Sequence, residues 1–269
     1  MDSSPPPLLT ATALGKTFGG VVALSGFDLT LQQGDLVGLI GPNGAGKTTA
    51  FNLLTGVLRQ GSGSIRLQGE EIGGLSPEGR AKRGLSRTFQ NIRLFDELTV
   101  LQNVKAGAHA GHGAGLAAIL LGLPSYRAAE RDIEAIAHKA LALCGLEAVA
   151  EERADALSYG DRRRVEIARA LAAEPNLLLL DEPAAGMNET EKESLSILIR
   201  CLNQEQGLTI VLVEHNVPMV ATLCRRVVVL DKGELLAQGA TAEVLADPQV
   251  IDVYLGRRRV TSGGADADA

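Results

Sequence analysis

Apolar and polar residues alternate with a period of two near the amino-terminal end of the chain, where polar positions separate Phe27, Leu29 and Leu31. Alternation of this kind predicts a half-buried strand. A continuous apolar run follows at Leu36–Ile40, and it predicts a strand that is covered on both faces. The first third of the chain, residues 8 to about 88, therefore favours strands.

The pattern becomes helical and rich in alanine from about residue 90 to residue 168, and it includes a helix predicted over residues 127–143. Within this part, residues 106–124 are heavy in glycine and alanine, which indicates a looser surface insertion. Strands and helices alternate again afterwards, with apolar strands predicted at Leu177–Leu180, Thr209–Val213 and Arg226–Leu230. This alternation predicts an α/β fold with a mostly parallel sheet, flanked by helices and interrupted by a helical block.

Composition narrows the class of protein. The 269 residues include 26 basic and 32 acidic ones without a long basic run, which argues against a nucleic-acid partner. The best candidate for a membrane span, Gly115–Leu123, has nine residues, where about 20 are needed. The first residues lack the basic and apolar parts of a secretory signal. Other subunits are therefore expected to do any membrane spanning.

Cysteine and histidine give no sign of a metal site. The three cysteines are odd in number and far apart, which favours buried free thiols in a reducing compartment. His109 and His112 lie close together in the insertion, but their spacing brings no further ligands. We interpret these two residues and His138 as surface residues. The three cysteines are Cys144, Cys201 and Cys224.

A glycine-rich phosphate loop is the most specific motif. Residues 41–48 match G-x-x-x-x-G-K-T, after an apolar strand and before a helical pattern. Glycines let several backbone N–H groups point at phosphates, and the start of the helix adds positive potential. Lys47 is expected to reach the β- and γ-phosphates, and Thr48 to offer its hydroxyl to Mg²⁺. By itself the motif indicates nucleotide binding, as in kinases and GTPases. The residues assigned to the nucleotide are Gly41, Pro42, Asn43, Gly44, Ala45, Gly46, Lys47, Thr48 and Thr49.

Two adjacent acids follow a run of four leucines, at Asp181 and Glu182. Carboxylates at the carboxyl end of a buried parallel strand lie where open α/β sheets bind ligands. Asp181 is suited to hold Mg²⁺ directly or through water, and Glu182 to act as the general base on the attacking water.

The segment Leu157-Ser158-Tyr159-Gly160-Asp161 and the helical run after it resemble the signature of ABC ATPases. Ser158 can cap the helix, and Gly160 permits a close backbone approach. The resemblance implies that Ser158 and Gly160 grip the γ-phosphate held by a partner's phosphate loop. Two cassettes would then close head to tail around two ATP molecules, so one chain alone would be an incomplete ATPase.

Other positions resemble the same family in the same order. Phe18 is similar to the aromatic residue that stacks on adenine, although a core role remains open. Gln90 resembles the glutamine that joins the Mg²⁺ and water site to the helical part. His215 resembles the switch histidine that contacts the γ-phosphate and orients Glu182.

Residues from about 8 to 258 share the resemblance, which implies one ABC ATPase domain of the P-loop NTPase fold. It would comprise an antiparallel β subdomain with the phosphate loop, an inserted helical subdomain, and a second half of the core, between two disordered ends. The expected boundaries are 8–89, 90–168 with the insertion at 106–127, 169–258, and the ends 1–7 and 259–269.

Several stretches resemble the ATPases of branched-chain amino acid uptake, such as residues 86–95, 182–188 and 250–256. This resemblance implies two transmembrane permeases, a second cassette that is a paralogue or a copy, and an external substrate-binding protein as an indirect partner. The chain would lie on the cytoplasmic face of the inner or plasma membrane. Importers of other amino acids, amides or urea, and the lipopolysaccharide type of exporter, remain alternatives. Ribosomal and DNA-repair ABC proteins fit poorly, because the chain has one cassette and neither a long coiled coil nor a zinc hook.

Two positions depart from the subfamily pattern, and one apolar segment suggests a partner. Asp161 replaces the usual glutamine, and its charge near a bound γ-phosphate is expected to weaken ATP-driven closure. Met187 replaces the usual leucine, a volume-conserving change expected to be nearly silent. After Gln90, part of an apolar set is expected to receive a loop of the membrane subunit, unless the whole set is core. This set is Ile92, Leu94, Phe95, Leu98, Val100 and Leu101.

Overall fold

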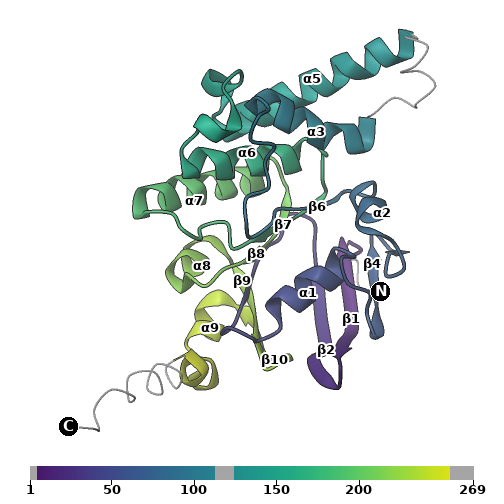
Figure 1. The fold of residues 1–269 in the computed structure, drawn as a ribbon. Coiled ribbons are helices and arrows are strands. Elements are labelled where there is room, and N and C mark those ends of the chain that lie inside the picture. Colours follow the sequence, from purple (N-terminus) through teal and green to yellow (C-terminus); the bar gives the residue numbers. More distant parts are fainter. Residues whose placement is uncertain (1–4, 113–123, 255–269) are drawn as a thin grey trace. The chain divides into compact units, whose positions relative to one another are not determined.

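The computed structural model describes residues 5–112 and 124–254. The chain forms two compact units: the first comprises Met1–Gln32, Leu36–Gly74 and Val211–Ala269, and the second Gln33–Asp35 and Leu75–Ile210. Figure 1 shows the elements along the chain.

The first unit contains a four-stranded antiparallel sheet in the order β2-β1-β4-β5. Its register pairs Leu9 of β1 with Leu31 of β2 on one side and with Leu67 of β4 on the other. Phe27, Leu29 and Leu31 are at most 2% exposed, so the predicted alternation does mark the buried face. The strands are β1 (Leu9–Phe18), β2 (Val21–Leu31), β4 (Ser62–Leu67) and β5 (Glu70–Glu71).

The first unit also contains the strands that carry the phosphate loop. β3 (Leu36–Ile40) pairs in parallel with β9 (Arg226–Asp231), and β9 pairs antiparallel with β10 (Glu234–Ala240). β10 was not predicted, because most of its residues are partly exposed and show no buried run. The helices are α1 (Lys47–Leu54), α8 (Val217–Leu223) and α9 (Thr241–Leu245), and β8 (Thr209–Val213) leads into this unit.

The second unit pairs two parallel strands and packs helices against one another. β6 (Leu85–Arg87) lies beside β7 (Leu177–Asp181), and every residue of β7 is buried. α3, α5 and α6 contact one another in pairs (Figure 1). The helices are α2 (Pro77–Ala81), α3 (Val100–His112), α5 (Pro124–Cys144), α6 (Tyr159–Leu171) and α7 (Glu189–Gln204), with short turns at Glu147–Val149 and Ala154–Ala156.

One glycine allows α3 to approach α6 closely. A Cβ atom placed on Gly107 would lie 2.0 Å from the backbone oxygen of Arg169 on α6. Such a distance is impossible without a shift of backbone, so Gly107 sets how near the two helices lie. At Gly111, one turn later in α3, an added Cβ atom would meet nothing within 4 Å.

The chain between Gln90 and α3 is not helical, which corrects the expectation of a helical pattern from about residue 90. The helix begins only at Val100. Thr99 and Gln102 exchange capping bonds at this start. Asn103 also competes with a helical path there, because its fully buried side chain bonds to the backbone of the preceding segment. Its Nδ2 donates to the oxygens of Phe95 and Thr99 at 3.0 Å each, and its Oδ1 accepts from the Phe95 N–H at 2.8 Å.

The predicted insertion at 106–127 falls partly on regular structure. Residues 106–112 complete α3 and residues 124–127 begin α5, whereas 113–123 lie outside the described residues. The ends predicted as disordered also lie outside them, except for residues 5–7, which form neither helix nor strand. Within the part of the chain that is described, no helix combines the length and apolar character that crossing a membrane requires.

Candidate functional site

The phosphate loop curls around its own lysine. Lys47 opens α1 and is 5% exposed, and its Nζ donates to the backbone oxygens of Gly41 at 2.7 Å and Pro42 at 3.0 Å. Gly46 caps the helix in the left-handed region with a φ of 102°, and the side chain of Thr48 is exposed. The loop thus places an ammonium group and the start of a helix side by side, which suits a polyphosphate.

The turn between β9 and β10 bonds to the phosphate loop. The N–H of Gly233 donates to the Ala45 oxygen at 3.0 Å, and the Gly233 oxygen accepts from the Ser25 N–H at 2.8 Å. A Cβ atom on Gly41 would lie 2.2 Å from the Leu230 oxygen, so only glycine fits there. Burial raises the pKa of the Tyr254 hydroxyl to about 12, and a backbone hydrogen bond from Gly41 opposes that shift. The carboxyl-terminal part of the unit therefore also contacts the loop.

The aromatic residue predicted to meet adenine is a surface residue. Phe18 ends β1 and is 45% exposed, and the Lys16 ammonium lies 5.4 Å from the centre of its ring. The alternative that Phe18 belongs to the core is wrong. An exposed ring on a strand end is available for stacking on a base.

His215 lies where β8 ends and α8 begins. Its side chain is exposed, and its N–H donates to the Glu214 carboxylate at 3.2 Å. Asn216 then caps α8 by accepting from the Met219 N–H at 3.0 Å. The predicted switch histidine is thus carried on a short turn between a buried strand and a capped helix.

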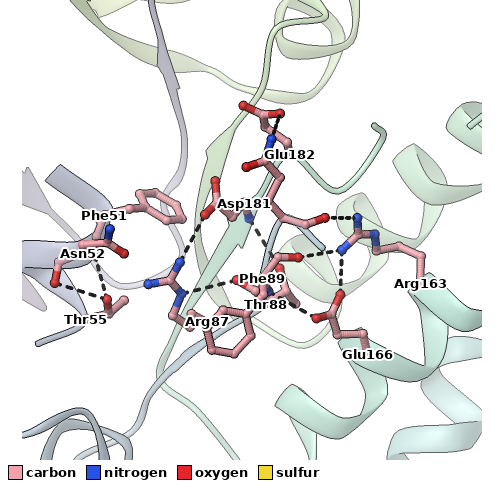
Figure 2. A network of polar contacts seen from close by, with 11 residues as sticks. Phe51, Asn52, Thr55, Arg87, Thr88, Phe89, Arg163, Glu166, Asp181 and Glu182 are labelled. Carbon is pink, nitrogen blue, oxygen red and sulfur yellow. Dashed lines mark hydrogen bonds and ion pairs between the residues drawn. The ribbon is translucent and has the colours of Figure 1, made fainter. Parts of the chain in front are cut away.

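The first of the two acids is buried at the end of β7 and held by an arginine (Figure 2). An Arg87 nitrogen lies 3.1 Å from Asp181 Oδ2, and the Asp181 N–H donates to the Thr88 hydroxyl at 3.4 Å. Burial raises the pKa of Asp181, and Arg87 works in the opposite direction by favouring the charged form. The sequence did not indicate that Arg87 pairs with Asp181.

The second acid meets the predicted glutamine. Gln90 Nε2 donates to Glu182 Oε2 at 2.9 Å, so the structure brings together two residues that are 92 positions apart. Glu182 has a left-handed backbone with a φ of 45°, which is rare for a residue that carries a Cβ atom. Such strain is typical of functional positions.

Two buried charges on α6 hold the backbone on either side of that glutamine (Figure 2). Arg163 donates to the oxygens of Phe89 at 2.8 Å and Gln90 at 2.7 Å, and it pairs with Glu166 at 2.6 Å. Glu166 in turn accepts from the Phe89 N–H at 3.2 Å. In the sequence, Arg163 is the middle one of three consecutive arginines on a predicted helix. This position gave no sign that Arg163 bonds to the backbone next to Gln90.

The signature segment begins α6, and Ser158 is its N-cap as predicted. The Ser158 hydroxyl accepts from the Asp161 N–H at 3.2 Å and lies 2.8 Å from the Asp161 carboxylate, to which it can donate. The carboxylate also lies 3.8 Å from Arg164. Gly160 is buried, and an added Cβ atom would lie 3.0 Å from a Glu191 carboxylate oxygen.

The tyrosine of the signature segment reaches the turn after the two acids. Tyr159 donates its hydroxyl to the Ala185 oxygen at 3.0 Å, and its ring lies 3.4 Å from where a Cβ atom on Gly186 would be. Met187 is 7% exposed, so its side chain belongs to the core. The signature segment and the turn 183–187 thus support one another within the second unit.

The apolar set after Gln90 divides between surface and core. Phe95 is 55% and Leu98 38% exposed, whereas Val100 is fully buried. Ile92, Leu94 and Leu101 are half-buried. Val100 is therefore core and not part of a docking surface, and the alternative that the whole set is core is also wrong.

The thiols and two of the remaining histidines, His109 and His138, differ in how far they are exposed. Cys144 and Cys224 are buried free thiols as predicted, but Cys201 is only partly buried. His138 is exposed, and His109 is half exposed with its Nε2 3.9 Å from Glu130. Among residues 5–112 and 124–254, no three His, Cys, Asp or Glu side chains are grouped as a metal site.

Comparisons with known proteins agree along almost the whole chain. A family model described as "ABC transporter" matches residues 24–185, and one described as "Branched-chain amino acid ATP-binding cassette transporter" matches residues 234–260. The chain is 41% identical over 250 residues to the high-affinity branched-chain amino acid transport ATP-binding protein BraF of Pseudomonas aeruginosa, with 93% of this chain and 98% of BraF covered. It is 36% identical over 251 residues to the lipopolysaccharide export system ATP-binding protein LptB of Haemophilus influenzae, with 93% and 98% covered.

Solved structures give the same result for the fold. The ADP conformation of MJ1267, an ATP-binding cassette of an ABC transporter, aligns with a TM-score of 0.80 at 29% identity, over 94% of this chain and all of that one. The dimeric structure of MJ0796, a bacterial ABC transporter cassette, aligns with a TM-score of 0.72 at 26% identity, over 87% of this chain and 98% of that one.

Proposed function

The chain belongs to the ABC transporter family and is an ATPase coupled to transport, and from this premise we propose that it powers the uptake of branched-chain amino acids. The match of residues 234–260 to the branched-chain amino acid cassette model carries this assignment of the cargo. The greater identity to BraF than to LptB also favours uptake over lipopolysaccharide export. Importers of other amino acids, amides or urea remain the alternative within the same subfamily.

We propose that residues 8–258 act as one ATPase domain. The loop 41–49 binds the phosphates. When ATP binds, the Lys47 ammonium exchanges its bonds to the loop oxygens for bonds to the β- and γ-phosphates. The exposed ring of Phe18 stacks on adenine. This assignment is supported by the curl of the loop around Lys47 and by the positive end of α1.

A magnesium ion would find suitable oxygen donors in this chain. Thr48 offers an exposed hydroxyl, Gln90 an amide oxygen, and Asp181 a carboxylate, and these hard oxygen ligands are the kind that Mg²⁺ prefers. When bound, the ion neutralises charge on the transferred phosphate. Arg87 bonds to Oδ2 of Asp181 and so holds this carboxylate at the end of β7.

The contact between Gln90 and Glu182 is the observation that best supports hydrolysis. A glutamate acting as general base must be held close to the water that it deprotonates. Gln90 donates to Glu182 Oε2 and so fixes the direction of the carboxylate. His215 supplies a further donor toward the γ-phosphate and orients Glu182.

A second cassette would complete the site. The Ser158 hydroxyl, the Gly160 N–H and the start of α6 would stabilise the γ-phosphate on the partner's loop. The dimeric solved relative supports a pair of cassettes. The family resemblance implies that the pair is head to tail and that the partner is a paralogue or a second copy. ATP binding would close the pair, and hydrolysis would release it.

The transporter itself would supply the membrane spans. Two permeases, served by an external substrate-binding protein, would hold the chain on the cytoplasmic face of the inner or plasma membrane. Phe95 and Leu98 are the exposed apolar residues best placed to receive a permease loop. No nucleic-acid partner is expected.

Turnover and cargo are tested separately. Glu182→Gln should bind ATP, accumulate a closed dimer and lose hydrolysis, and wild-type turnover in this variant would remove Glu182 from the role of base. Deletion of the gene should abolish uptake of labelled leucine, isoleucine and valine, with rescue by the wild type and none by Glu182→Gln. Retained uptake of all three, together with lost uptake of urea or amides or a defect in the outer membrane, would overturn the assignment of cargo.

A further inference from the structure

A buried arginine and glutamate on α6 hold the backbone of the Gln90 loop at three points. Arg163 is fully buried, and its two terminal nitrogens donate separately to the oxygens of Phe89 and Gln90 (Figure 2). Glu166 is 1% exposed, and its Oε1 accepts from the Phe89 N–H. The backbone on both sides of the Phe89–Gln90 peptide is therefore bonded to one helix.

A buried ion pair needs a reason beyond stability. Removing two charges from water costs several kcal/mol per ion, and well-packed apolar residues often replace such a pair without loss. Burial raises the pKa of Glu166 because it disfavours the charged form, and Arg163 opposes the shift. Apolar side chains could fill the same volume, but they could not bond to the Phe89 N–H and to the two oxygens.

The loop that is held carries the contact to Glu182. The Gln90 side chain is exposed, so nothing packs it into one conformation, and its reach to Glu182 Oε2 depends on the position of its backbone. The same helix begins at Ser158, five residues before Arg163. Direct hydrogen bonds therefore link the helix that follows the signature segment to the Gln90 backbone.

We infer that Arg163 and Glu166 are positioning residues: they fix the Gln90 backbone so that its side chain meets Glu182, and they tie that contact to the signature end of α6. This inference rests on the proposed role of Glu182 in hydrolysis. Neither residue touches the nucleotide in this scheme. Their effect should appear in turnover and not in the affinity of the phosphate loop for ATP.

The test replaces the pair by apolar residues in the full-length chain. The double variant R163M/E166M removes both buried charges together, so no charge is left unpaired. The loss of three bonds to the loop backbone should lower its thermal stability without unfolding it. Its ATP dissociation constant should stay within about twofold, whereas kcat should fall by about tenfold or more, because small misplacements of catalytic groups have large effects on rate. Unchanged kcat in a folded variant would overturn the inference.

A double-mutant cycle with Gln90 distinguishes a positioning role of the pair from a general contribution to the fold. If the pair acts through Gln90, Gln90→Ala should lower kcat in the wild type but add almost nothing in R163M/E166M. Full additivity would mean that the pair acts elsewhere and would overturn the inference. The matched control removes the exposed pair Arg153–Asp155 as R153Q/D155N, which should leave kcat and affinity unchanged.

A second variant covers the case in which the double variant does not fold. Arg163→Lys keeps a charge beside Glu166 but lacks the fork that reaches two oxygens at once. It should fold, keep its affinity for ATP and lose turnover, and full turnover would again overturn the inference. If the wild type itself shows no ATP turnover, the proposed function fails and the positioning role falls with it, an outcome distinct from those above.

Discussion

Replacing Asn103 by aspartate should loosen the segment that joins Gln90 to α3. The side chain is fully buried, and the change keeps its shape while removing the Nδ2 that donates to the Phe95 and Thr99 oxygens. The Oδ1 bond from the Phe95 N–H can persist. Two donated bonds are lost, and a carboxylate is left facing two carbonyl oxygens.

The expected cost follows from those two bonds. A buried partner left without its hydrogen bond costs about 1–3 kcal/mol, so the loss of both bonds in Asn103→Asp should destabilise the protein by roughly 2–6 kcal/mol at pH 7. For a chain of this size that corresponds to a fall in Tm of roughly 5–15 °C. Thermal and urea unfolding followed by circular dichroism measure both quantities. The deficit should shrink as the pH falls, because a raised folded-state pKa costs stability as the pH rises and a protonated aspartate regains one donor.

The neighbouring residue provides the control. Gln102 accepts from the Thr99 N–H through an exposed amide oxygen, and Gln102→Glu keeps that acceptor at the start of α3. This variant should change the free energy of unfolding by less than about 0.5 kcal/mol. If Asn103→Asp is as stable as Gln102→Glu, the buried bonds do not hold the segment, and our explanation of its non-helical form is wrong.

Three further outcomes can be measured on the same protein. Gly107→Ala should cost about 1–3 kcal/mol, because its methyl group would meet a backbone oxygen of α6, whereas Gly111→Ala should be neutral or stabilising by up to about 1 kcal/mol; equal urea midpoints would contradict this. Burial raises the pKa values of Cys144 and Cys224 from 9.0 to about 12, so between these pH values the two thiols ionise only in the unfolded chain. The free energy of unfolding should therefore fall with rising pH, by up to about 1.4 kcal/mol per pH unit for each thiol. Urea titrations from pH 8 to 11 should give a shallower fall when both thiols are alanine, and parallel curves would refute it. Asp161→Gln should strengthen ATP-driven pairing in gel filtration, and unchanged affinity and turnover would count against a weakening role for the acid.

Local patterns predicted the parts of the site that depend on neighbours in sequence. The phosphate loop is one uninterrupted motif between a strand and a helix, and Ser158 caps α6 through a bond that spans three residues. The burial of β7 followed in the same way from its four leucines. In each case the chemistry lies within a few residues, so the sequence itself displays it.

Contacts across long stretches of chain were not predictable. Arg163 and Gln90 are 73 residues apart, and a run of three arginines on a helix usually indicates an exposed face. Likewise, the helical pattern before Val100 gave way to the bonds from Asn103, because side chain to backbone bonds compete with helix formation. Both cases concern buried polar groups, whose partners are set by tertiary packing rather than by periodicity.

The backbone at Glu182 also bears on how this protein would respond to laboratory evolution. A φ of 45° costs a residue with a Cβ atom about 1–2 kcal/mol, whereas glycine adopts it freely and asparagine tolerates it well. A library screened only for heat resistance should therefore enrich Gly or Asn at this position and yield robust proteins that no longer turn over ATP. A selection for a more stable form of this cassette therefore has to measure ATP hydrolysis in the same round.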